Sequence, residues 1–201
     1  IPTICYHQVD KGNAMAIALD DDLNEWKKLE VITPETKEGD AYHDTYRSWD
    51  PFGWLEDDTY YAIFGGKNPG IAKSQTLKGG WHYTGDLFAH GVEGIALDED
   101  LSCADLFKLD NRDILMGISH KLGCRYYIGE WKDEQFYPQS HAQMSWKDNS
   151  FFAPESLVDN KGRRIMWAWL MDVVHWRQGW DRGWTGTMSL PRVLSISDDG
   201  M

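Results

Sequence analysis

The chain of 201 residues lacks long apolar runs and has few basic residues and few cysteines. No stretch approaches about 18 consecutive apolar residues, and Ile1 leads directly into a strand-like run without a basic leader, so no membrane span or signal peptide is visible and the compartment stays open. The formal net charge of −12 argues against nucleic acid as a partner. Cys5, Cys103 and Cys124 are odd in number and lack metal-ligand spacing, which argues against a disulfide framework.

Helical periodicity and metal-ligand patterns are also scarce. Only Asp20–Leu29 fits a short helical turn, and no other segment has helical length with caps. His82, His90, His141 and His175 lack the spacing of metal ligands, so we expect neither a metal nor a cofactor.

Aromatic residues, in contrast, are abundant. The chain has 11 Trp, 9 Tyr and 7 Phe. Such density is typical of all-β packing, and it also favours sugar binding, because the C–H faces of sugar rings stack on aromatic rings. For any single Trp, packing in the core is the simpler interpretation.

A repeat of about 55 residues indicates the architecture. Strand-like runs, each followed by a polar turn and in most cases a second such run, lie at Thr3–His7, Thr59–Phe64, Asp113–Ser119 and Arg164–Leu170. The second runs include Asn13–Leu19, Gly70–Lys73 and Arg125–Gly129. An aromatic residue follows each of them, Trp26, Trp81 and Phe136, at successive intervals of 55. This pattern predicts blades of four antiparallel strands and therefore an all-β propeller.

The same count divides the chain. We expect a single, incomplete propeller domain over residues 1–201, with blades at 1–47 (partial), 48–100, 101–150 and 151–201, because the first repeat begins at what should be its second strand. About three and a half to four blades are therefore expected. An open ring leaves unpaired strand edges, which predict homo-oligomers formed by strand pairing.

The innermost strands of a propeller face one another across its axis, so their first residues are the candidates for a site. Those strands begin near Asp50, Ser102 and Phe152. This places Asp50, Asp105 and Glu155 among the groups expected to line one cavity. Glycoside hydrolysis needs such a pair of carboxyl groups, one protonated and one ionised.

Several motifs resemble glycoside hydrolase family 32, the β-fructosidases. Trp49-Asp50-Pro51, Ser102-Cys103-Ala104-Asp105 and Phe152-Ala153-Pro154-Glu155 are similar to the family's Arg-Asp-Pro, Glu-Cys-Pro-Asp and Tyr-Ala-Pro-Gln, in the same order. The similarity continues in the segments 22–26, 162–169 and 184–192. The resemblance implies that Asp50 holds sugar hydroxyls and stabilises the transition state.

Two departures concern catalysis. The family's nucleophile lies in an Asn-Asp-Pro-Asn-Gly motif, and this string does not occur in the 201 residues. At the position of the acid/base glutamate stands Ser102, whose hydroxyl cannot transfer protons well near neutral pH. Glu155 and Glu99 are the candidates for the missing acid, and Glu155 is preferred because it belongs to an inner-strand motif.

Further residues are candidates for substrate binding. Trp49 replaces the family's arginine, and Arg47, on the same face of the strand, could supply the lost cation. His120 could touch a sugar hydroxyl, although a hydrogen-bonded structural histidine is an equal alternative. The remaining candidates are Ser102, Asp105 and Trp169.

We therefore expect a five-bladed propeller when complete, acting as a retaining glycoside hydrolase on β-fructofuranosides of the sucrose, levan or inulin type. The chain alone is expected to be inactive, because it lacks the nucleophile. A non-catalytic carbohydrate-binding propeller and an arabinan- or xylan-acting propeller hydrolase are the alternatives. In each case the expected partner is an oligo- or polysaccharide.

Overall fold

The computed structural model describes residues 1–8, 12–33, 49–145, 150–172, 184 and 186–197, and it contains four antiparallel sheets, named here blades 1 to 4 in chain order. Blade 1 contains β1 (Thr3–Gln8), β2 (Gly12–Ala18) and β3 (Trp26–Val31). Blade 2 contains β4 (Trp49–Glu56), β5 (Thr59–Gly65), β6 (Gly70–Ser74) and β7 (His82–Asp86). Blade 3 contains β8 (Ser102–Leu109), β9 (Arg112–Ser119), β10 (Gly123–Lys132) and β11 (Gln135–Gln143). Blade 4 contains β12 (Phe151–Val158) and β13 (Arg164–Met171), with β14 (Gly186–Met188) and β15 (Arg192–Val193) both paired to β13.

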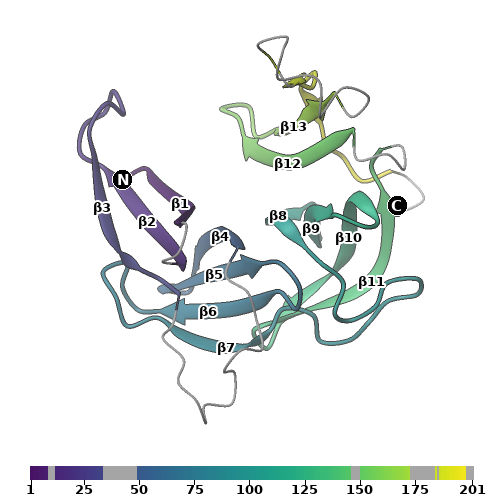
Figure 1. Cartoon of the computed structure of the whole chain (residues 1–201), viewed down its shortest axis with the longest axis horizontal. Coiled ribbons are helices and arrows are strands. Elements are labelled where there is room, and N and C mark those ends of the chain that lie inside the picture. The colour runs from purple at the N-terminus through teal and green to yellow at the C-terminus, as the bar shows by residue number, and fades with distance from the viewer. Residues whose placement is uncertain (9–11, 34–48, 146–149, 173–183, 185, 198–201) are drawn as a thin grey trace.

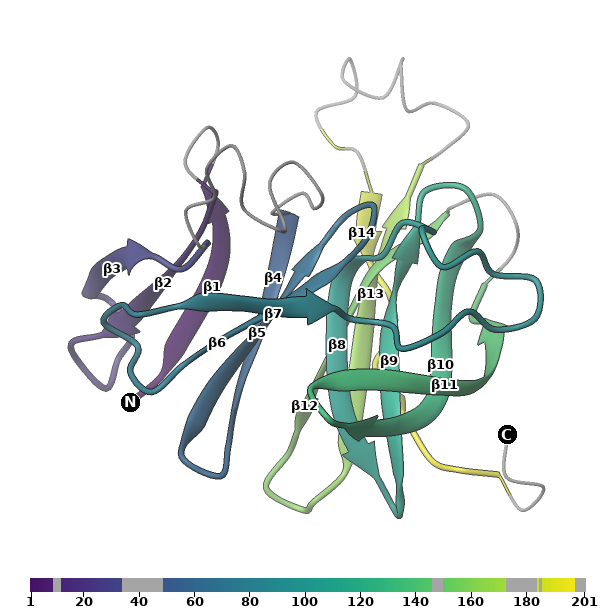
Figure 2. The ribbon, with the colours of Figure 1, turned by 90° about the horizontal axis from the view of Figure 1, so that it is seen from below.

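The four blades stand around a common centre, with β4, β8 and β12 nearest to it (Figure 1). Turning the view shows that β4 and β8 run beside each other along this centre (Figure 2). The predicted all-β propeller is thus confirmed, with four blades in the chain. The exact blade boundaries and the single-domain division stay predictions. None of the described residues forms a helix long and apolar enough to cross a membrane.

The strand predictions agree with the sheets. The predicted first runs became β1, β5, β9 and β13, and the second runs became β2, β6 and β10. The aromatics spaced by 55 mark the outermost strand of each blade, since Trp26 opens β3, Trp81 precedes β7 and Phe136 lies in β11. The predicted helical turn at 20–29 is wrong, because a turn at 20–23 leads directly into β3. There Asp20 accepts the backbone N–H groups of Asn24 and Glu25, which satisfies the turn without a helix.

The core lies between neighbouring blades, where apolar side chains of successive sheets pack together. Ile63, Leu115 and Phe136 are fully buried between blades 2 and 3. Between blades 3 and 4, Met116 and Met166 belong to a second buried cluster. Burying a side chain of this size stabilises the fold by about 1.5–3 kcal/mol. The interblade cores therefore fix how neighbouring inner strands lie relative to one another.

Backbone contacts between blades fix the inner strands further. Gly66 and Leu101 exchange two backbone hydrogen bonds of 2.7 and 3.1 Å, which join blade 2 to the residue before β8. At Gly65 a Cβ atom would lie 2.8 Å from the Leu101 oxygen, so only glycine permits this approach. On the other side, the buried Asn13 of β2 donates its side-chain amide to the Trp49 oxygen at 3.4 Å. These contacts hold the first residues of β4 and β8 in place.

Candidate active site

The three inner strands carry the same irregularity near their first residues. The pairing register shifts between Trp49 and Phe52 in β4, between Ser102 and Asp105 in β8, and between Phe152 and Glu155 in β12. Each shift contains one non-glycine residue with positive φ, namely Asp50 (28°), Cys103 (49°) and Ala153 (49°). Such bulges bend a strand and re-aim its side chains, and they are frequent next to active sites. Asp50, Cys103 and Ala153 are therefore structurally equivalent.

Asp50 and Cys103 meet between blades 2 and 3. The Cys103 Sγ lies 3.8 Å from Oδ2 of Asp50, and both residues are half-buried. Burial, followed by the charges of Asp50 and Glu155, raises the pKa of the Cys103 thiol. The thiol is therefore a neutral neighbour of two carboxyl groups from different blades.

Glu155 of β12 completes this group. Its side chain remains accessible to solvent, but the surrounding protein removes much of its water, and this desolvation together with the charges of Asp105 and Asp50 raises its pKa to about 7. A carboxyl group in this state is partly protonated at neutral pH and can donate a proton. The convergence of Asp50, Asp105 and Glu155 stays a prediction, and the raised pKa of Glu155 is consistent with it.

Asp105 is placed differently from the other two. It is 1% exposed, and its Oδ2 accepts a 2.5 Å hydrogen bond from the Ser156 hydroxyl of blade 4. Ser156 in turn accepts a bond from Nη1 of Arg164 at 2.9 Å. Burial raises the pKa of Asp105, while the Ser156 hydrogen bond and the Arg164 charge oppose the rise. The structure thus holds this predicted substrate-binding residue between blades 3 and 4.

Ser102 and Glu99 also face protein partners. Ser102 is 1% exposed, and its hydroxyl donates to Oδ1 of Asp100 at 3.2 Å. Glu99 accepts a 2.6 Å hydrogen bond from the hydroxyl of Ser119, a fully buried residue at the end of β9. Glu99 is therefore tied to the β9–β10 turn, whereas Glu155 belongs to the bulge of the inner strand β12.

Asp100 was missed by the sequence analysis. Its Oδ2 accepts two hydrogen bonds from His120, one from the backbone N–H at 2.7 Å and one involving Nδ1 at 2.6 Å. The side chain of His120 is 57% exposed. The sequence offers only a weak signal for this pair. An acidic residue stands two positions before the inner strand β8, and a histidine directly follows β9, the strand that pairs with β8.

Aromatic rings surround this pair and extend across two blades. The His120 ring lies edge-on to Trp49, with centroids 6.5 Å apart, and to Phe152, at 5.6 Å. Phe152 in turn lies edge-on to Trp169 at 6.2 Å. The predicted residues Trp49, His120 and Trp169 are thus brought together through Phe152, which the prediction omitted. The Arg47 prediction falls outside the described residues.

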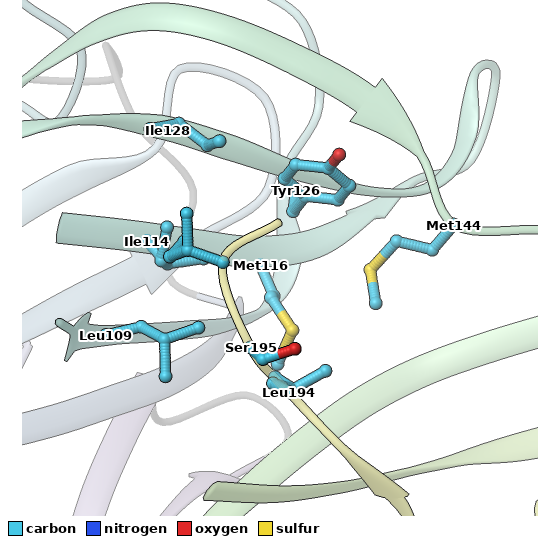
Figure 3. A pocket seen from close by; sticks show the side chains of 9 residues that line it. Leu109, Ile114, Met116, Tyr126, Ile128, Met144, Leu194 and Ser195 are labelled. Carbon is cyan, nitrogen blue, oxygen red and sulfur yellow. The ribbon is translucent and has the colours of Figure 1, made fainter. Parts of the chain in front are cut away.

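A separate cavity of about 170 Å³ lies between blade 3 and the segment 194–196 (Figure 3). Its lining residues are mostly apolar: Leu109, Ile114, Met116, Tyr126, Ile128, Met144, Leu194, Ser195 and Ile196. It contains none of the predicted site residues. Within the described ranges, no group of three or more His, Cys, Asp or Glu side chains could hold a metal ion.

Sequence comparisons identify the family to which the chain is similar. The model of the family "Glycosyl hydrolases family 32 N-terminal domain" matches residues 3–201. A sucrose-6-phosphate hydrolase from Bacillus subtilis is 28% identical over 90% of this chain and 41% of its own length. One from Escherichia coli is 30% identical over 74% of this chain and 34% of its own length. The chain thus spans well under half the length of these curated relatives.

Solved structures share the fold. A family 32 β-fructofuranosidase from Bombyx mori has a TM-score of 0.66 and 18% identity over 98% of this chain and 46% of its own. Fructan 1-exohydrolase IIa from Cichorium intybus, solved with 1-kestose, has a TM-score of 0.69 and 21% identity over the whole of this chain and 43% of its own. An endo-arabinase from Bacteroides thetaiotaomicron is similar over 75% of this chain, with a TM-score of 0.55.

Proposed function

This chain belongs to glycosyl hydrolase family 32, and on that premise we propose that it supplies the sugar-binding wall and the proton donor of an enzyme that hydrolyses β-fructofuranosides. The observation that carries this proposal is the group formed by Asp50 and Glu155. Their charges interact across blades, and Glu155 has a pKa of about 7. Glu155 can therefore be protonated near neutral pH and donate a proton.

The roles follow from the chemistry of glycoside hydrolysis. In a retaining reaction, a nucleophilic carboxylate attacks the anomeric carbon while an acid protonates the departing oxygen, and water then hydrolyses the glycosyl intermediate. Asp50 binds hydroxyls of the fructosyl unit and stabilises the transition state, and Glu155 donates the proton. The nucleophile comes from outside these 201 residues, because the family's Asn-Asp-Pro-Asn-Gly motif is not among them.

Glu155 is a better proton donor than Glu99. Glu99 accepts a hydrogen bond from Ser119 at 2.6 Å, which ties its carboxyl group to the β9–β10 turn. Glu155 instead experiences two negative charges, which favour its protonated form. We therefore assign the acid to Glu155 and a supporting role in the β9–β10 turn to Glu99.

The binding residues divide into two groups. Trp49, His120 and Trp169 carry exposed or half-buried rings near the axis and are proposed to contact sugar, together with Arg47. Asp105 and Ser102 are buried, so we propose that they position neighbouring residues. Asp105 holds blade 4 through its hydrogen bond with Ser156. Ser102 holds Asp100 through its hydroxyl group.

The substrate class comes from the relatives. The matched proteins are named sucrose-6-phosphate hydrolase, β-fructofuranosidase and fructan 1-exohydrolase, and their common bond is a β-fructofuranosidic one. We propose sucrose, levan or inulin type substrates for this chain. The similarity to an endo-arabinase concerns the fold alone.

Hydrolysis of sucrose, inulin and levan tests the proposal. The 201-residue chain should be inactive, whereas the chain extended at its N-terminus by a strand bearing Asn-Asp-Pro-Asn-Gly should turn over a fructoside, and Glu155→Gln should abolish most of that turnover. Robust turnover by the 201 residues alone would overturn the assignment of the nucleophile. An extended chain that binds fructose but never hydrolyses a fructoside would identify a binding module.

A further inference from the structure

Asp100, two residues before β8, and His120, the residue after β9, form a hydrogen-bonded pair. One carboxylate oxygen, Oδ2 of Asp100, accepts hydrogen bonds from both the backbone N–H and Nδ1 of His120, at 2.7 and 2.6 Å. The other oxygen accepts the Ser102 hydroxyl. With Nδ1 donating to the carboxylate, both the tautomer and the plane of the imidazole are fixed. A histidine needed only for packing does not require this second anchor.

The pair also contacts Ser102, which stands at the position of the family's acid/base glutamate. Ser102 is buried beneath it, while the His120 side chain is 57% exposed and touches the rings of Trp49 and Phe152. These two rings belong to the first residues of β4 and β12, on either side of β8. A ligand that reaches the axis from this end therefore meets the imidazole between two aromatic edges.

We propose that the Asp100–His120 pair, together with Trp49 and Phe152, binds the departing sugar of the substrate, and that it takes an uncharged hexose. This inference rests on the proposed function, in which Asp50 holds the fructosyl unit. The Asp100–His120 pair would then hold the other sugar of the substrate. The oriented imidazole exchanges hydrogen bonds with a hydroxyl, and the aromatic rings pack against the C–H face of the sugar.

The preference for an uncharged sugar follows from the local charges. The Asp100 carboxyl group contacts His120 directly, and Asp50 lies beside Cys103 near the first residues of β8. A phosphate dianion in this place would be repelled by several carboxyl groups.

The test is an NMR titration of the 201-residue chain with three probes: fructose, glucose and glucose 6-phosphate. Glucose should shift the imidazole signals of His120 and the indole signal of Trp49, and it should bind more tightly than glucose 6-phosphate. His120→Ala should weaken glucose binding about three- to tenfold, the loss expected for one hydrogen bond, and should weaken fructose binding less than Asp50→Asn does. Asp100→Asn, which keeps the shape, should also weaken glucose binding. His82→Ala, at an exposed histidine of β7, is the matched control and should change neither.

The outcomes separate the two proposals. If glucose binds equally well with and without His120 while fructose binding still depends on Asp50, the leaving-sugar site is refuted and the proposed function stands. If glucose 6-phosphate binds as tightly as glucose, the preference for an uncharged sugar is refuted. If fructose does not bind, or binds without Asp50, the proposed function fails and this inference fails with it.

Discussion

The Cys103 Sγ lies 3.8 Å from Oδ2 of Asp50, although the two residues are 53 positions apart. This contact joins two equivalent bulges on neighbouring inner strands, and Glu155 follows the third. The same bulge thus recurs near the first residues of the inner strand in blades 2, 3 and 4. The predictions below test this arrangement and the forces that hold it.

The first prediction concerns the acid. A carbon-detected NMR titration of the Glu155 carboxyl group in the 201-residue chain should give a midpoint near pH 7. Asp50→Asn should lower that midpoint, because it removes one of the negative charges that oppose ionisation of Glu155. A Glu155 midpoint near 4.5 that Asp50→Asn does not change would mean that the two carboxyl groups do not interact.

Stability should depend on pH through the same residue. The pKa of Glu155 is raised in the fold from 4.5 to about 7. The stability that the fold gains from binding this proton is therefore complete below about pH 4.5, and it is lost as the pH rises through 7. Glu155→Gln removes this loss. The free energy of unfolding, measured in urea, should therefore increase in the variant relative to the wild type as the pH rises from 5 to 8. Parallel profiles would contradict the raised pKa.

The contact between blades 3 and 4 should matter for stability. Ser156→Ala removes the hydrogen bond to the buried Asp105 and should lower the free energy of unfolding by about 1–3 kcal/mol, because a buried acceptor loses its partner. Ser140→Ala on β11, an exposed serine, is the control and should stay within about 0.5 kcal/mol. Equal effects of the two substitutions would argue that Asp105 is solvated.

Backbone strain at the third bulge gives another test. Ala153 has a φ of 49°, which a β-branched residue adopts only at a cost. Ala153→Val should destabilise the chain by roughly 1–3 kcal/mol, and Ala153→Gly should be neutral or stabilising. Ala142→Val in β11 is the control, since Ala142 lies in regular strand pairing. A harmless Ala153→Val would mean that the bulge is not a fixed feature.

Strand edges predict self-association. Among the described strands β1 pairs with β2 alone, so its other edge can accept a strand from a second copy. Light scattering across a concentration series should show a mass that grows with concentration. A constant monomeric mass would contradict this prediction.

The fold was predictable because its signals are local and repeated. Apolar runs such as Thr59–Phe64 and Asp113–Ser119, with polar turns between them, report strand pairing directly, and the aromatics at intervals of 55 report the blade. The helical turn at 20–29 failed because Asp20 can satisfy backbone N–H groups in a turn as well as in a helix.

The site was only partly predictable. The motifs identified Asp50 and Glu155, whose roles stay proposals, but the burial of Asp105 depends on Ser156 and Arg164 in another blade. Asp100 was missed because its partner, His120, is 20 residues away and no period or motif links the two. Side-chain direction after a bulge is a property of tertiary structure, and a single sequence does not contain it.

The central claim is that Asp50 and its neighbours form a wall that holds a fructosyl unit. Calorimetric titration of the 201-residue chain with fructose tests it most directly, with Asp50→Asn as the variant and Asp110→Asn, in an exposed turn, as the matched control. The account predicts saturable binding that Asp50→Asn weakens at least about tenfold, the loss expected for hydrogen bonds to a charged group, and that Asp110→Asn leaves unchanged. Equal affinity in all three proteins, or no binding in the wild type, would contradict it.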